Sequence, residues 1–213
     1  MGTGGQSTDA GGPPSDAAVS DGNVSTPPVD GGGYMGRWVS VTIKDAIIGP
    51  AKADGNPWDG FGSVDQGVLH AVADALVGTN PVAAVLAALG NPALLAVSKP
   101  DPFGWAQASV FGTIGDAYWL AQDPPAMQDT VTPTWPYGWY YQNVPIDSDV
   151  RIGVTVIDSD LSTNDAIGSA EINSDDLKDA LAAQQKFEVR VDDQTDGQLL
   201  FIGISVIQQQ GPL

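Results

Sequence analysis

The chain has 213 residues, of which 26 are acidic and 8 are basic, with one histidine and no cysteine. A formal net charge of −18 argues against a nucleic-acid partner, and it disfavours anionic lipid head groups unless a cation bridges the two surfaces. The absence of cysteine excludes disulfide bonds, thiolate metal sites and cysteine nucleophiles.

Residues 1–33 consist mostly of small and polar residues and contain no aromatic residue. Such a segment cannot bury enough apolar surface to offset its ordering entropy, so we predict a disordered tether. No signal-peptide or membrane-span pattern is visible. The tether fits a plain flexible N-terminus, or an exported bacterial protein or lipoprotein of the cell envelope whose leader is missing. We favour the second interpretation.

The folded part is expected over residues 34–208, followed by a flexible C-terminus at 209–213. Residues 38–48, WVSVTIKDAII, begin with alternating polar and apolar side chains, which predicts a strand. Gly49-Pro50 ends this strand.

A helical insertion is predicted over about residues 62–98, where apolar side chains recur at helical spacing. Two Asn-Pro pairs, at 80–81 and 91–92, have the residue types preferred at helix starts. The segment PVAAVLAALG is apolar on every side, so it either packs against its neighbours or meets another apolar surface such as lipid. It is too short to span a bilayer.

Strand patterns resume after Lys99 and are separated by turn signals. We predict strands near 104–111, 116–121, 127–132, 138–144, 150–157, 166–172, 186–191 and 198–207. One helix is predicted within SDDLKDALAAQ, with Ser174 as its N-cap. The fold class is therefore all-β: an antiparallel β-sandwich of about eight strands with a small α-helical insertion.

Catalytic signals are weak. The single histidine, His70, falls on the predicted solvent face of an insertion helix. The sequence has no G-x-S-x-G, no H-E-x-x-H and no glycine-rich phosphate loop between a strand and a helix. Carboxylate pairs are numerous, but none stands out. We therefore expect a protein that is not an enzyme.

The loop DSDLSTND crowds Asp158, Asp160 and Asp165 together, and no Lys or Arg occurs between residues 154 and 172. Aspartates in a solvated turn are one interpretation. An EF-hand is excluded, because Thr163 stands where the loop needs glycine and Ser169 where it needs glutamate.

A second acidic set flanks the insertion, with Asp59 before it and Asp101 after it. If the two ends of the insertion meet, these aspartates come together opposite the three of the later loop. Ca²⁺ takes six to eight oxygen ligands, and loops at one end of a sandwich can supply them. A bound divalent cation would offset the repulsion among five carboxylates.

Three motifs in this order make the chain similar to the C2 domains over residues 37–207. They are Trp58-Asp59 with the later Asp101-Pro102-Phe103, then Pro133-x-Trp135, and then Asp158-x-Asp160 with Asn164-Asp165-x-Ile167-Gly168. The resemblance implies an eight-stranded antiparallel sandwich whose calcium-binding loops lie at one end and dock onto phospholipid head groups.

Carried over to this sequence, the resemblance implies Asp59 as the ligand of the first loop and Asp101 as the second. It implies Asp158, Asp160 and Asp165 as ligands of the third loop. Asp54 is a further candidate for the first position, and Pro133 and Trp135 are expected to be structural.

Three departures from the family pattern stand out. The first loop is interrupted by 41 residues between Asp59 and Asp101. The third loop is about one residue shorter than usual between Asp160 and Asp165. No Lys or Arg occurs between Lys99 and Arg151, where many family members carry a lysine-rich strand.

The sequence thus favours a monomeric, Ca²⁺-binding C2-like module that docks to anionic phospholipid membranes. The alternative is a non-catalytic structural or adhesive domain of the cell envelope. In that case Ca²⁺ only stabilises the loops, and the partner is a protein or a glycan.

Overall fold

The computed structural model describes residues 24–25, 34–52, 54–60, 62–121, 126–135, 140–160, 163–191 and 198–211. The predicted tether lies outside these residues except at β1 (Val24–Ser25), which pairs with β5 (Tyr140–Pro145). The last two residues of the predicted flexible C-terminus also lie outside them, and β9 (Leu199–Gln209) extends to its first residue.

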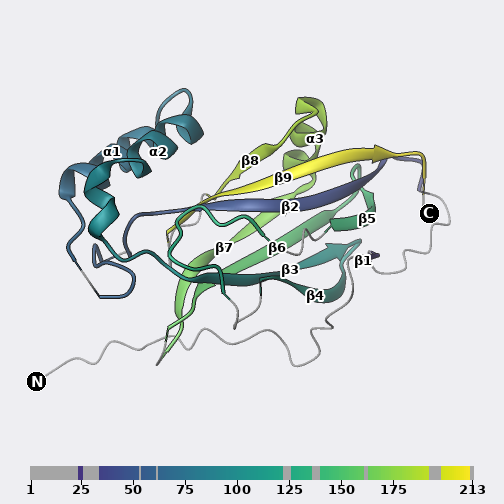
Figure 1. Cartoon of the computed structure of the whole chain (residues 1–213). Helices are drawn as coiled ribbons and strands as arrows, with labels where there is room; N and C mark the ends of the chain where they lie inside the picture. Colours follow the sequence, from purple (N-terminus) through teal and green to yellow (C-terminus); the bar gives the residue numbers. More distant parts are fainter. Residues whose placement is uncertain are drawn as a thin grey trace, which may run out of the picture.

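Two sheets pack face to face, which confirms the predicted β-sandwich (Figure 1). One sheet has the order β1-β5-β2-β9-β8, with β2 at Trp38–Ile48 and β8 at Phe187–Arg190. The other has the order β4-β3-β6-β7; its strands are β3 (Pro102–Val110), β4 (Thr113–Ala121), β6 (Val150–Asp158) and β7 (Asp165–Asn173). Every pairing is antiparallel except that of β1 with β5.

The strand predicted at 127–132 does not form. Asp129 adopts a left-handed backbone conformation with φ of 49°, which breaks an extended strand. The segment nevertheless follows β2, because Ile48 N donates to Val131 O and Ala46 N donates to Pro133 O. It therefore covers the edge of β2 without forming a regular ladder.

The helix predicted after β7 is α3 (Ser174–Ala183), and its N-cap is Asn173 instead of Ser174. The Asn173 side chain accepts from the amides of Asp175 and Asp176, and the Asp176 carboxylate accepts from the amide of Asn173. This reciprocal capping box satisfies donors at both ends of the first turn.

The insertion consists of α1 (Gln66–Leu76), α2 (Pro81–Leu89) and the 3₁₀ helix η1 (Pro92–Ala96), at one end of the sandwich (Figure 1). Val85 of α2 is fully buried in a cluster with α1 and β9, whereas Leu86 on the same helix is 43% exposed. The apolar helix therefore packs on one face and shows apolar side chains to solvent on another. Among the described residues, no helix combines the length and the apolar composition of a membrane span.

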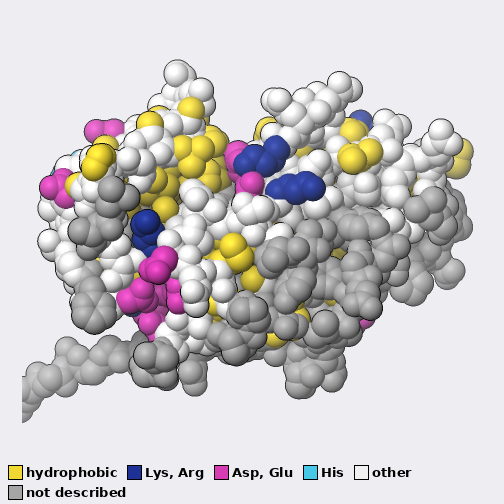
Figure 2. All heavy atoms as spheres, in the orientation of Figure 1, with side chains coloured by type: hydrophobic (Ala, Val, Ile, Leu, Met, Phe, Trp, Pro, Cys, Tyr) yellow, Lys and Arg dark blue, Asp and Glu magenta, His cyan; other side chains and the backbone are white. Residues whose placement is uncertain are grey.

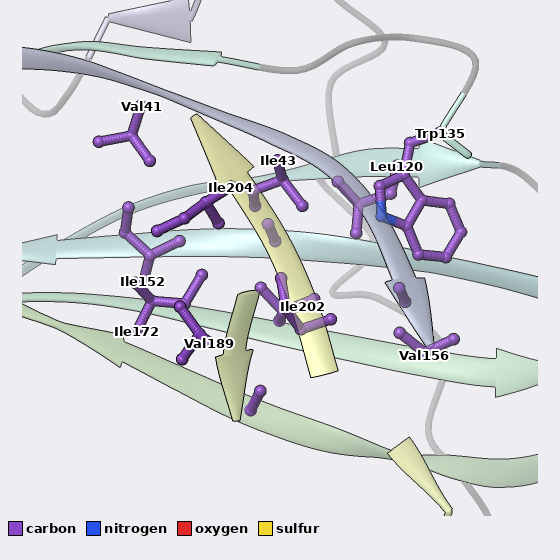
Figure 3. Packing of buried hydrophobic residues seen from close by; sticks show 14 of the residues in the cluster. Val41, Ile43, Leu120, Trp135, Ile152, Val156, Ile172, Val189, Ile202 and Ile204 are labelled. Carbon is purple, nitrogen blue, oxygen red and sulfur yellow. The ribbon is translucent and has the colours of Figure 1, made fainter. Parts of the chain in front are cut away.

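The main core fills the space between the two sheets with branched aliphatic side chains and a few aromatic ones (Figure 3). Ile152 of β6, Ile172 of β7 and Ile204 of β9 are fully buried there. Trp58, from the loop after β2, belongs to the same core and is 1% exposed. The loop before the insertion is thus attached to the sandwich itself.

We expect Ile152→Ala to lower the free energy of unfolding by about 2–5 kcal/mol, because it leaves a cavity in a closely packed core. Urea denaturation followed by circular dichroism measures this change. The matched control is Ile114→Ala, since Ile114 is 69% exposed on β4. A control that loses as much stability as Ile152→Ala would contradict this account of the core.

Candidate metal centre

Three carboxylates converge at the end of the sandwich that carries the insertion. Asp59, Asp158 and Asp160 each offer an oxygen, and these oxygens all lie within 4.8 Å of one another. Asp158 is the last residue of β6, and Asp160 follows two residues later. Figure 2 shows the acidic side chains gathered at the left of the view, below the insertion, with a basic side chain beside them.

Asp59 is positioned beside the other two carboxylates because Trp58, the residue before it, is anchored in the core. Trp58 packs in the main core, and its Nε1 donates to Gly49 O at 3.1 Å. The loop after β2 is therefore closed on itself just before Asp59. Burial raises the pKa of Asp59, and the negative charges of Asp101 and Asp160 raise it further.

Asp158 is the one charged side chain that is fully buried among the described residues. Its Oδ1 accepts from the amide of Asp101 at 2.6 Å, while its Oδ2 is buried without a hydrogen-bond partner. Burial raises the pKa of Asp158 to about 7, against the opposing effect of the Asp101 amide, and the charges of Asp160 and Asp59 add to the rise. This oxygen without a partner therefore belongs to one of the three converging carboxylates.

Asp101 lies next to the cluster and holds two loops together. Its carbonyl accepts from Ser159 N at 3.0 Å, and its Oδ1 accepts from Asp129 N at 2.7 Å. Its carboxylate thus already has a backbone donor, although its charge acts on Asp59. The structure brings Asp101 beside the three converging carboxylates but not into that set.

Asp165 forms an ion pair with Lys52. Burial raises the pKa of Asp160, and the charge of Asp165 raises it further. Asp54 is not among the three grouped carboxylates. It is exposed, and its carboxylate accepts from the backbone amide of Asn56 at 3.0 Å and from the Asn56 side chain at 2.7 Å. Those bonds stabilise a local turn.

Two residues at this end, Lys52 and Asp129, were not expected from the sequence. Lys52 supplies the counter-charge that the loop 154–172 lacks, and Asp129 donates its amide to Asp101. Lys52 carried a signal, as the only basic residue between Lys44 and Lys99. Asp129 was placed in a predicted strand at 127–132, so nothing in the sequence indicated that it lies beside Asp101.

The donor set fits a hard divalent cation. All three converging groups are carboxylates, and the described residues contribute no nitrogen or sulfur ligand to the cluster. Oxygen-only sites suit Ca²⁺ or Mg²⁺. A buried carboxylate oxygen without a hydrogen-bond partner is unfavourable, and coordination to a cation is one way to satisfy it.

No family model and no curated protein matches the sequence. Among solved structures, the chain is similar to human GIVD cytosolic phospholipase A2, with a TM-score of 0.43 and 12% identity, over 84% of this chain and 17% of that one. It is also similar to Extended-Synaptotagmin 2 comprising an SMP domain and two C2 domains, with a TM-score of 0.38 and 13% identity, over 81% of this chain and 27% of that one.

The chain spans less than a third of each of these structures. Likenesses with TM-scores and identities this low carry no argument about the function of this chain. The resemblance to C2 domains therefore rests on the sequence motifs and on the two-sheet architecture.

The pKa of Asp158 predicts how stability depends on pH in protein kept free of metal by a chelator. An aspartate in an unfolded chain titrates near pH ~4, whereas Asp158 in the fold titrates at about 7. The folded state thus binds the extra proton between these values, so this contribution to stability is lost as pH rises from 4 to 7. Asp59 and Asp160 have raised pKa values and act in the same direction, while Lys52 stays charged.

Asp158→Asn isolates the contribution of Asp158, since the amide oxygen can still accept from Asp101 N. Urea denaturation of both proteins at several pH values should show the native protein losing stability relative to the variant as pH rises through this window. If stability changed with pH in the same way in both proteins, the raised pKa of Asp158 would not be the cause of the pH dependence.

Proposed function

We propose that this protein is a Ca²⁺-binding, C2-like β-sandwich module that docks onto phospholipid membranes when the ion is bound. The observation that carries the proposal is the buried, partnerless Oδ2 of Asp158 in a group of three carboxylates. In this proposal Asp59, Asp158 and Asp160 hold the ion. Asp101 and Asp165 lie at the edge of the cluster as additional oxygen donors.

Calcium suits this group better than magnesium does. Ca²⁺ accepts six to eight oxygens in flexible geometries, whereas Mg²⁺ requires a near-ideal octahedron and keeps several waters. Asp59 and Asp160 lie on loops outside regular structure, and Asp158 is the last residue of β6. A site of this kind adapts to an ion that tolerates irregular coordination.

The membrane part of the proposal follows from charge. The chain carries a net charge of −18, so anionic head groups are repelled unless a cation lies between the two surfaces. A Ca²⁺ ion held by the acidic cluster supplies that bridge, because a lipid phosphate oxygen can complete its coordination. Docking in this proposal is therefore strictly dependent on the ion.

We further propose a non-catalytic, monomeric role at the cell envelope or outside the cell. The single histidine, His70, is exposed on α1. The acidic, small-residue composition of residues 1–33 is the feature that favours a location at the envelope or outside the cell.

Calcium binding is tested by calorimetric titration of the chelator-treated full chain. Asp59→Asn should weaken binding about tenfold or more, because it removes one charge at the ion. Asp54→Asn is the matched control on the same loop, and screening should limit its effect to about threefold. Equal losses for both variants would show that the site depends only on net charge, and heat-silent titrations of the native chain would refute calcium binding.

Membrane docking is tested by sedimentation with vesicles of phosphatidylserine and phosphatidylcholine. The native chain should sediment with the vesicles in Ca²⁺ and remain in solution with chelator, and Asp59→Asn should remain in solution in both. Calcium binding with strong thermal stabilisation but no sedimentation would favour the structural or adhesive envelope domain. Equal sedimentation with and without Ca²⁺ would remove the proposed mechanism.

A further inference from the structure

Lys52 brings a positive charge into the acidic cluster from the loop that follows β2. Its Nζ forms an ion pair with Asp165 Oδ2. The charges of Asp165, Asp160 and Asp158 all raise the pKa of Lys52 against the opposing effect of its burial. The ammonium lies 6.0 Å from the centroid of the Trp58 ring. Lys52 is therefore paired with Asp165 at the edge of the cluster, and it interacts through its charge with Asp158 and Asp160, two of the proposed metal ligands.

The backbone of Lys52 is held in place independently of this ion pair. Its amide donates to Asn56 O and its carbonyl accepts from Gly55 N, both at 2.9 Å. Ala51, directly before it, is 1% exposed in a cluster with residues of α1 and η1. The Lys52 side chain, in contrast, is 27% exposed. The ammonium can therefore move into solvent while the loop keeps its shape.

We propose that Lys52 is a tethered competitor of the metal: its ammonium neutralises the acidic cluster in the metal-free protein, and a divalent cation must displace it to bind. This inference rests on the proposed function of the same cluster. Lys52 thereby determines how tightly the site binds and which ions it accepts. No step requires Lys52 to lose its proton.

A tethered group competes at the high local concentration that its short link imposes. The apparent affinity for the ion falls in proportion to the fraction of molecules whose ammonium has left the cluster. A monovalent ion brings no more charge than the ammonium that it replaces. A divalent ion brings twice that charge, and it also offers coordination to the partnerless Oδ2 of Asp158. Lys52 should thus exclude Na⁺ and K⁺ while permitting Ca²⁺ at higher concentrations.

The test compares Lys52→Met with the native full chain by calorimetric titration of calcium chloride after chelator treatment. Without the competing charge, Lys52→Met should bind Ca²⁺ about tenfold tighter or more. Lys44→Met is the matched control, since Lys44 is exposed on β2 and its loss changes the net charge by the same amount. The control should bind Ca²⁺ within about twofold of the native chain.

A second measurement uses the native chain, so it does not depend on the folding of a variant. Acetic anhydride labels exposed lysine amines, and mass spectrometry of peptides measures the extent at each lysine. Saturating Ca²⁺ should increase the labelling of Lys52 several-fold while that of Lys44 stays constant. Unchanged or reduced labelling of Lys52 in protein that binds Ca²⁺ would overturn the inference.

The outcomes separate this inference from the function on which it rests. Equal affinities in the native chain and Lys52→Met, or a weaker variant, would overturn the role of Lys52 and leave calcium binding in place. Absence of binding in both would refute the proposed metal site and the competition with it. Binding only in Lys52→Met would support the competition by Lys52 and refute the Ca²⁺-dependent function proposed for the native chain.

Discussion

The acidic end of this protein depends on one constraint, which is the burial of the Asp158 carboxylate at the end of β6. Removing an ionised carboxylate from water costs on the order of several kcal/mol unless its partners replace the lost hydration. The pairing of β3 with β6 ends at Pro102 opposite Asp158, so the amide of Asp101 is free to donate to it. That bond satisfies one oxygen and leaves the other without a partner. A proton, the nearby charge of Lys52 or a bound cation can offset the negative charge of the group.

A proton, the Lys52 ammonium and a divalent cation each require a different arrangement of the surrounding loops. A proton needs only the raised pKa that burial produces. The ammonium of Lys52 needs a loop that closes at Asn56 and directs the side chain toward Asp165. A divalent cation would use Asp59 and Asp160 as well. It would offset the repulsion that adds to the effect of burial in raising their pKa values. The apolar core between the sheets stabilises the fold, so the loops can retain an electrostatic arrangement that is unfavourable without a cation.

The sequence predicted the sandwich because strand alternation and turn residues are local signals. It also predicted five converging carboxylates, of which the structure groups Asp59, Asp158 and Asp160 but not Asp101 and Asp165. It ranked Asp59 ahead of Asp54 on the same loop but could not exclude Asp54. The separation depends on the core position of Trp58 and on the turn that Asp54 forms with Asn56. The ion pair of Lys52 with Asp165 joins residues 113 positions apart, and no periodic pattern encodes such a contact. The segment around Asp129 has strand-like composition, but a left-handed residue prevents the ladder.

The 41 residues between Asp59 and Asp101 raised the question of whether the insertion displaces the first loop. It does not, because the chain is fixed to the sandwich immediately before and after it. Trp58 packs in the main core just before Asp59, and Pro100 O accepts from Thr130 N at 3.0 Å just before Asp101. Between these points the insertion packs in its own small clusters, one against β9 and one around Ala51. A long insertion can therefore separate two residues of one compact site, provided that both of its ends are anchored to the sandwich. The entropic cost of closing such a loop grows only slowly with its length.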